Sequence, residues 1–174
     1  MLPDPLHPAV VHFPIVLTFL LPIVALVALW AIRRGTAPRR AWAIPLVVSA
    51  ALAVSSWVAV ETGESQEEKV ERVVPERAFD SHEEGAEQFL ALSGALVLVV
   101  AVGLASGIVG RSARILATAG ALALIVAAAR VGHTGGQLVY RYGAARAYTG
   151  GDTLSTVAPD RGARAPTERK GHER

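Results

Sequence analysis

The chain contains no cysteine among its 174 residues. This absence excludes disulfide bonds, thiolate nucleophiles, cysteine-held iron–sulfur clusters and the covalent attachment of c-type haem. Charge is also scarce, because only 18% of the residues are charged whereas 52% are hydrophobic, far from the mixture of an ordinary soluble domain. The net charge of +2 comes from scattered basic residues, so no nucleic-acid partner is expected.

The apolar residues are gathered into long blocks. Four blocks are long enough to cross the hydrocarbon core of a bilayer as helices: about residues 9–32, 41–60, 86–109 and 113–131. The first block is not expected to be a cleaved signal, since no basic segment precedes it. The sequence therefore predicts an all-α integral membrane four-helix bundle in residues 1–148, followed by a disordered polar tail in residues 149–174.

The basic residues next to the spans predict an orientation. Six arginines lie in or beside the two short turns between spans, namely Arg33, Arg34, Arg39, Arg40, Arg111 and Arg114. The first eight residues contain no Lys or Arg. By the positive-inside rule both turns lie in the cytoplasm. The sequence thus predicts a multi-pass protein of the bacterial inner membrane with both termini on the periplasmic side.

The connection between the second and third spans is acidic. Residues 61–85 contain nine acidic and three basic residues. Ser65 and Glu68 fit a capping box, and an apolar stripe follows them, so we expect a short interfacial helix on the bilayer surface. The stripe consists of Val70, Val73 and Val74.

Two further signals concern the third span. Ser81 and Glu84 fit a second capping box, which predicts that the third helix begins at His82. Near the other end of the span, Gly103 and Gly107 form a G-x-x-x-G motif. Such a motif allows close helix packing, either within the bundle or in a homo-oligomer.

Four of the five histidines lie at the ends of the apolar blocks, and the number of spans puts all four on one side of the membrane. They are His7, His12, His82 and His133. Imidazoles gathered at one end of a helical bundle can hold a metal ion or a haem. The simpler interpretation is that prolines and polar residues here only shape the ends of the spans, and for His7 this interpretation is favoured.

Two histidines are the preferred ligands. His12 lies in an apolar run, and Pro14 is expected to kink the helix so that His12 turns inward. At the last span, the paired glycines Gly135 and Gly136 are expected to end the helix just after His133. A glycine pair also lets another group approach the backbone closely.

The neighbours of these histidines add two expectations. Arg130 shares a helix face with His133 and needs a partner within an apolar segment, for which Glu61 or a haem propionate would serve. On a helix, His82 shares a face with Phe89 and can point inward. His82 is therefore the substitute for either preferred ligand.

The motifs at the two ends of the chain resemble those of a known family. LHPAVVHFPI near the start and GHTGGQLVYRYG after the last span look like the bacterial membrane family called domain of unknown function 2231, and TGESQEEKVE with HEEGAE resembles the acidic middle loop of one branch of that family. The resemblance spans roughly residues 5–148 and implies a four-helix membrane domain, fused in some members to cytochrome c-type modules. The recurrent family positions are His7, Pro8, His12, Phe13, Pro14, Gly63, His82, Gly135, Gly136, Tyr140 and Gly143; Tyr142 departs from the pattern, since many relatives are expected to have histidine there.

Three functions follow from these observations. The first is a b-type haem protein with His12 and His133 as axial ligands, His82 as the substitute and Arg130 at the propionates. Such a protein would transfer electrons to a membrane or periplasmic redox partner.

The second is a non-enzymatic membrane subunit or assembly factor of a larger complex, whose histidines make interhelical hydrogen bonds. The third is a divalent zinc or copper site, with ligands drawn from His7, His12, His82, His133 and a carboxylate. No G-x-S-x-G motif is present, and enzymatic activity of the chain on its own is not expected.

Overall fold

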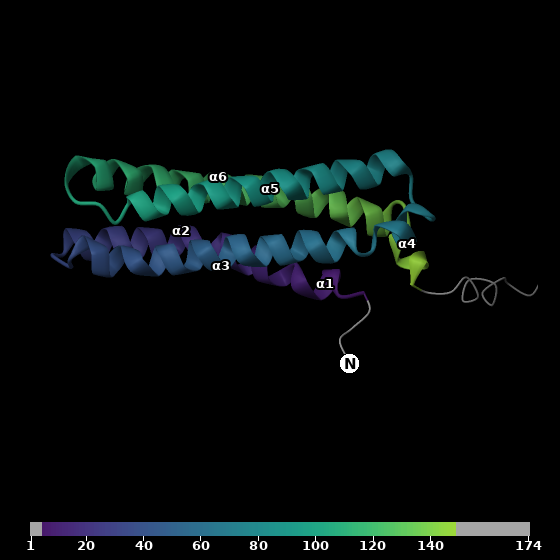
Figure 1. Cartoon of the computed structure of the whole chain (residues 1–174), viewed down its shortest axis with the longest axis horizontal. Helices are drawn as coiled ribbons and strands as arrows, with labels where there is room; N and C mark the ends of the chain where they lie inside the picture. Colours follow the sequence, from purple (N-terminus) through teal and green to yellow (C-terminus); the bar gives the residue numbers. More distant parts are fainter. Residues whose placement is uncertain (1–4, 149–174) are drawn as a thin grey trace, which may run out of the picture.

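Four long helices lie side by side and form the molecule (Figure 1). The computed structural model describes residues 5–148, so the predicted disordered tail lies outside the described residues. The long helices are α2 (His12–Arg33), α3 (Pro38–Glu64), α5 (Glu76–Val102) and α6 (Gly107–Tyr140). The short ones are α1 (His7–Val10), α4 (Glu67–Glu71) and the 3-10 helix η1 (Ala144–Ala147).

The long helices have the length and composition of membrane spans. Each is long and apolar enough to cross a bilayer, with α1 continuing into the first span. Large apolar side chains cover the outside of the bundle, as shown by Val47 and Leu98, whose exposed fractions are 68% and 69%. A lipid environment removes the cost of exposing them. The predicted all-α four-span membrane bundle is therefore confirmed.

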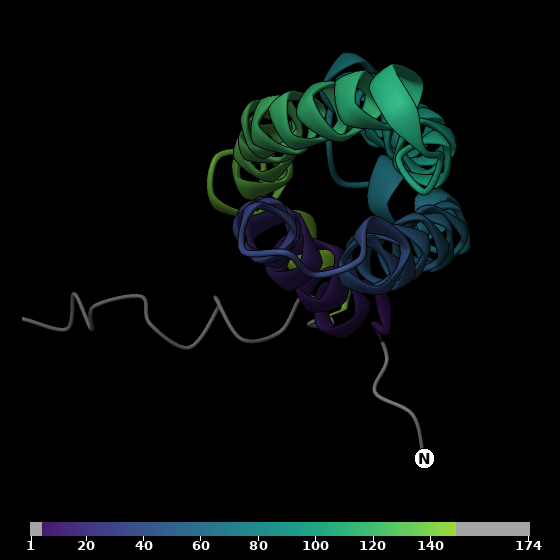
Figure 2. The same ribbon diagram turned by 90° about the vertical axis from the view of Figure 1, so that its left-hand side faces the viewer.

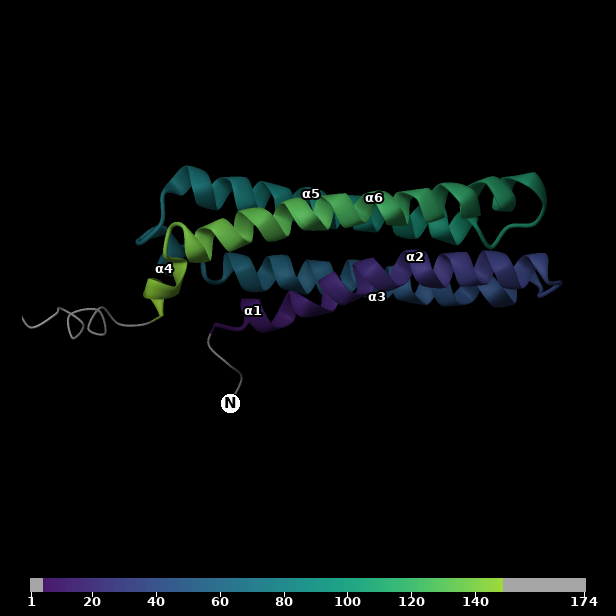
Figure 3. The ribbon, with the colours of Figure 1, turned by 180° about the vertical axis from the view of Figure 1, so that it is seen from behind.

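The bundle consists of two helical hairpins. Residues 34–37 connect α2 to α3, and residues 103–106 connect α5 to α6. Across the hairpins α3 packs against α5 and α2 against α6, which gives the closed ring seen along the bundle axis in Figure 2. We call the end that carries the two short connections the turn end. The opposite end, with α1, α4 and η1, is the histidine end (Figure 3).

The turn end is fixed by two polar side chains. Trp42 is fully buried and its Nε1 donates a hydrogen bond to the carbonyl of Val100 at 3.0 Å. The buried guanidinium of Arg114 donates to the carbonyl of Gly103 at 2.6 Å. Both bonds end on carbonyls in the last turn of α5 or just beyond it, so they tie α3 and α6 to this end of α5.

Several helix boundaries differ from those that the sequence predicts. α5 begins at Glu76, more than a turn before His82, and no side-chain cap bond is present at its start. α6 continues through Gly135 and Gly136 to Tyr140. The C-cap residue Arg141 is right-handed, and the glycine with a left-handed conformation is Gly143, with φ of 75°, which precedes η1.

The two glycines of the predicted G-x-x-x-G motif do not lie on one helix. α5 ends at Val102, so Gly103 lies in the turn, and Gly107 begins α6 with φ of 72°. Gly107 therefore shapes the connection, whereas Gly103 does allow a close contact, because a Cβ there would clash with the ring of Trp42 in α3.

The acidic connection folds onto the protein. Val70 and Val74 are buried together with Phe79, Leu138 and Ala144 in a second, smaller core. The apolar stripe predicted to lie on the bilayer thus faces the bundle, and only Val73 is substantially exposed. Ser65 ends α3 and makes no side-chain cap for α4. This second core closes the histidine end.

Candidate ligand site at the histidine end

Two histidines from different hairpins meet at this end of the bundle. The ring centroids of His7 and His82 are 6.4 Å apart, with an angle of 84° between the ring planes. His7 begins α1 and His82 lies in the second turn of α5. Both side chains are half-buried. The structure therefore brings His7, which the sequence favours as structural, next to His82, which the sequence offers as the substitute ligand.

The ring of His7 is held by α3. Its Nδ1 lies 2.8 Å from the carbonyl oxygen of Ala59 and 3.5 Å from the hydroxyl of Thr62. A Cβ added to Gly63 would lie 3.3 Å from both Cε1 and Nδ1 of His7. The absence of a side chain at Gly63 thus lets the imidazole lie directly on the last turns of α3.

The ring of His82 is held by α6 in the same way. Its Nδ1 lies 3.1 Å from the hydroxyl of Thr134. A Cβ added to Gly135 would lie 2.9 Å from Cε1 of His82. This distance is shorter than ordinary van der Waals contact, so only glycine fits without a shift.

The partners of Nδ1 determine the tautomer of each ring. A carbonyl oxygen can only accept, so Nδ1 of His7 donates its proton to Ala59. The hydroxyl of Thr134 donates to the carbonyl of Val131 at 3.0 Å, and it therefore accepts from Nδ1 of His82. In a neutral imidazole with a proton on Nδ1, Nε2 carries a lone pair.

These lone pairs are chemically available. Within residues 5–148, Nδ1 makes the contacts of His7 with Ala59 and Thr62 and the contact of His82 with Thr134, and the carbonyl of Val131 is a further hydrogen-bond partner of His82. Neutral imidazole nitrogen is a common ligand of iron, copper and zinc. The site therefore presents two imidazole ligands, each with its other nitrogen already hydrogen-bonded, as is usual for metal-binding histidines.

The two preferred histidines of the sequence analysis are placed elsewhere. His12 is exposed, and its Nδ1 contacts only the nearby carbonyl of Ala9 at 3.3 Å. His133 is also exposed, and its Nε2 lies 2.9 Å from the side-chain amide of Gln137 on the same helix. The expected inward turn of His12 at Pro14 does not occur, because Pro14 itself takes the buried position.

The expectations for charged groups also change. Arg130 is exposed, and among the described residues it forms no ion pair with Glu61. In residues 5–148 no group of three or more His, Asp or Glu side chains is placed to hold a metal ion. The four-ligand zinc or copper site expected from the histidines and a carboxylate is thus not formed by these residues.

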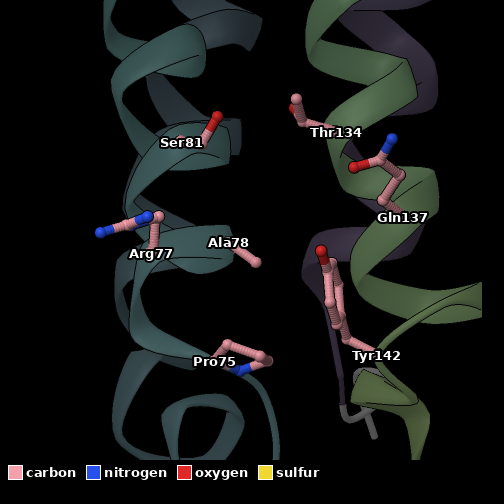
Figure 4. Close-up of a pocket in the computed structure, with 7 residues that line it drawn as sticks. All are labelled: Pro75, Arg77, Ala78, Ser81, Thr134, Gln137 and Tyr142. Carbon is pink, nitrogen blue, oxygen red and sulfur yellow. The ribbon is translucent and has the colours of Figure 1, made fainter.

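A pocket of about 310 Å³ lies next to His82, between the start of α5 and the end of α6 (Figure 4). Figure 4 shows the hydroxyls of Ser81 and Tyr142 directed toward the space between the two helices. Thr134, which binds His82, also lines this pocket. Tyr142, the residue that departs from the family pattern, therefore lines the same pocket as Thr134, the hydroxyl partner of His82.

The role of Thr134 is not among those predicted from the sequence. A repeated Thr-Gly step could have revealed it, because Thr62–Gly63 and Thr134–Gly135 each lie near the end of the second helix of a hairpin. A hydroxyl followed by a residue without a side chain offers an imidazole both a hydrogen bond and space.

The comparisons with known proteins agree with the fold. The family model described as "Predicted membrane protein (DUF2231)" matches residues 3–147. Neither a curated protein nor a solved structure matches the chain. The matched segment includes all four spans and the histidine pair. The chain is a multi-pass membrane protein that belongs to the DUF2231 family.

Proposed function

We propose that this protein is an electron-transfer subunit of the membrane, in which His7 and His82 bind a redox-active metal centre, haem b iron in the first place. The observation that carries the proposal is the pair of imidazoles, one from each hairpin, at a centroid separation of 6.4 Å. His7 and His82 replace the pair His12 and His133 that the sequence favours, because the latter are exposed and bonded within their own segments.

The separation of the rings fits ligation from opposite sides of one metal. A nitrogen–metal bond is about 2.0–2.1 Å, and a ring centroid lies about 1.1 Å behind its nitrogen, so two opposed imidazoles have centroids about 6.3 Å apart. Tetrahedral ligation would bring the centroids to roughly 5 Å. The observed 6.4 Å matches the opposed arrangement in length, but the rings meet edge to face at 84°, so at least one imidazole must turn before both Nε2 atoms face one metal.

Opposed ligation by two imidazoles suits a centre that needs little else from the protein. Haem iron receives its four in-plane ligands from the macrocycle and takes two axial ligands from side chains. Copper(I) is the other candidate, since it accepts two-coordinate linear binding. Structural zinc is disfavoured because it takes four protein ligands, and residues 5–148 offer no such group.

The test is an absorption spectrum of the full chain purified from a haem-replete host, before and after dithionite, together with elemental analysis. Haem gives a Soret band that shifts on reduction; copper(I) gives stoichiometric copper without a Soret band. His7→Ala and His82→Ala should each lose the centre. His12→Ala and His133→Ala are matched controls, because both histidines are exposed, and they should keep it.

Two results would overturn the proposal. One is wild-type protein that contains neither haem nor copper. The other is equal loss of the centre in the control variants, which would show that His7 and His82 have no special role.

A second function is favoured by one observation. Each imidazole already connects two helices through Nδ1, His7 to α3 and His82 to α6. Such interhelical bonds contribute roughly 0.6 kcal/mol each on average. In a non-enzymatic subunit or assembly factor with structural histidines, His7→Ala and His82→Ala would lower thermal stability or partner co-purification, and metal content would be negligible throughout.

A further inference from the structure

The two hairpins have the same layout around the histidine pair. Each hairpin is connected by four residues at the turn end, 34–37 in the first and 103–106 in the second. In each, a histidine near the start contacts a threonine near the end, at sequence separations of 55 and 52 residues. α3 packs against α5, and α2 packs against α6. If the first hairpin takes the place of the second, each of these two contacts becomes the other, so the packing is the same from either hairpin. This pattern is that of an approximate internal two-fold repeat.

The repeated threonines have the same local hydrogen bonds. Thr62 donates its hydroxyl proton to the helix carbonyls of Val58 and Ala59, at 2.9 and 3.0 Å. Thr134 donates to Val131 at 3.0 Å. Since each hydroxyl has one proton, the oxygen that remains toward the imidazole can only accept.

The two halves differ in which group receives the imidazole proton. For His7, the carbonyl of Ala59 is the nearer acceptor at 2.8 Å, and Thr62 is marginal at 3.5 Å. For His82, the hydroxyl of Thr134 lies 3.1 Å from Nδ1, and the carbonyl of Val131 is a further hydrogen-bond partner on the backbone. The short contact of His7 is thus with backbone, whereas the 3.1 Å contact of His82 is with a side chain that can be replaced.

We infer that Thr134 is a positioning residue, which holds the proton of His82 on Nδ1 and leaves Nε2 free to bind a metal, and that Ala59 and Thr62 do the same for His7 in the repeated half. The position of the proton on each ring is inferred from the hydrogen bonds alone. Its use in metal binding rests on the proposed function.

The tautomers are measured by NMR of the full chain in detergent micelles, with ¹⁵N-labelled histidine and two-bond ¹H–¹⁵N correlations. Both His7 and His82 should carry their proton on Nδ1. In Thr134→Val, which keeps the shape but removes the hydroxyl, His82 should change to the Nε2–H form that free histidine favours, while His7 stays unchanged. Thr134→Ser should restore the wild-type signal.

The controls separate this role from a structural one. Thr118→Val removes a hydroxyl that makes the same bond to a helix carbonyl, at 2.8 Å to Arg114, in the middle of α6, and it should leave both tautomers unchanged. Thr62→Val should leave His7 on Nδ1–H because Ala59 still accepts.

The outcomes distinguish this inference from the proposed function. An Nε2–H form of His82 in the wild type, or an unchanged tautomer in Thr134→Val, overturns the inference. If the wild type binds haem or copper, Thr134→Val should weaken that binding about 10- to 100-fold, and unaltered binding counts against the positioning role. If the tautomers behave as stated but the wild type binds neither, the positioning of the proton is supported and the metal-binding proposal fails.

Discussion

His82 lies against Gly135 so closely that the site has no room for even one additional methyl group. A Cβ at Gly135 would lie 2.9 Å from Cε1 of His82, whereas a Cβ at the next residue, Gly136, would meet nothing within 4 Å. Two adjacent glycines on the same helix thus have different purposes. Gly135 permits the contact between α5 and α6, and Gly136 is not required for it.

This difference predicts opposite effects of two alanine substitutions. Gly135→Ala must displace the imidazole of His82 and should lower the free energy of unfolding by about 1–3 kcal/mol, the usual range for overpacking. Gly136→Ala should raise it by about 0.5–1 kcal/mol, because alanine is the better helix former. Thermal unfolding in a single detergent measures both. Equal effects of the two substitutions would contradict the contact.

Hydropathy was sufficient to predict the architecture. Runs of apolar residues are the direct consequence of crossing a bilayer, and they identified four spans and the common location of the histidines at one end. The ends of the spans were less predictable. α6 continues through Gly135 and Gly136 because packing against His82 holds these residues in a helix that glycine propensity alone would end.

The choice of histidines could not be made from the sequence, because it depends on how far each helix rotates about its axis. His7 and His12 differ by five residues, more than one turn, yet only His7 faces α3. Membrane depth favoured His12 as the ligand, but Pro14 took the buried position. The contact of His7 with Gly63 involves residues far apart in the chain, and a single sequence does not specify such pairs.

Trp42 should be the tryptophan that matters for stability. It is completely buried and donates a hydrogen bond to the Val100 carbonyl at 3.0 Å. Trp42→Phe should lower the free energy of unfolding by about 1 kcal/mol for the lost bond, with a further loss of packing. Trp57 is 54% exposed on the outside of the bundle, so Trp57→Phe should be nearly neutral in the same thermal assay. A neutral Trp42→Phe would show that this bond contributes little.

Arg114 should stabilise the turn between α5 and α6, whereas Arg111 should not. The buried guanidinium of Arg114 donates to the carbonyls of Gly103 and Ala105, at 2.6 and 3.4 Å. Replacing it in Arg114→Met should lower the free energy of unfolding by about 1.5–3 kcal/mol, the range for hydrogen bonds from a charged group. Arg111 is exposed, and Arg111→Met should change stability by less than about 0.5 kcal/mol. Similar losses in the two variants would indicate a general charge effect.

The orientation can be tested directly because the chain has no native cysteine. The arginines near the turn end predict that this end lies in the cytoplasm. Glu71→Cys, at an exposed position of the histidine end, should react with a membrane-impermeant maleimide in intact spheroplasts. Ala37→Cys, exposed in the connection between α2 and α3, should react only after permeabilisation, and the unsubstituted chain should not react at all.

Under the proposed function, the result also decides on which side of the membrane the redox partner would bind. Labelling of Ala37→Cys from outside would reverse the predicted topology and place His7 and His82 at the cytoplasmic face. Electrons would then be exchanged with a cytoplasmic partner. Labelling of Glu71→Cys alone would place the histidine pair, and the partner expected under the proposed function, on the periplasmic side, since the pair and residue 71 lie at the same end of the bundle.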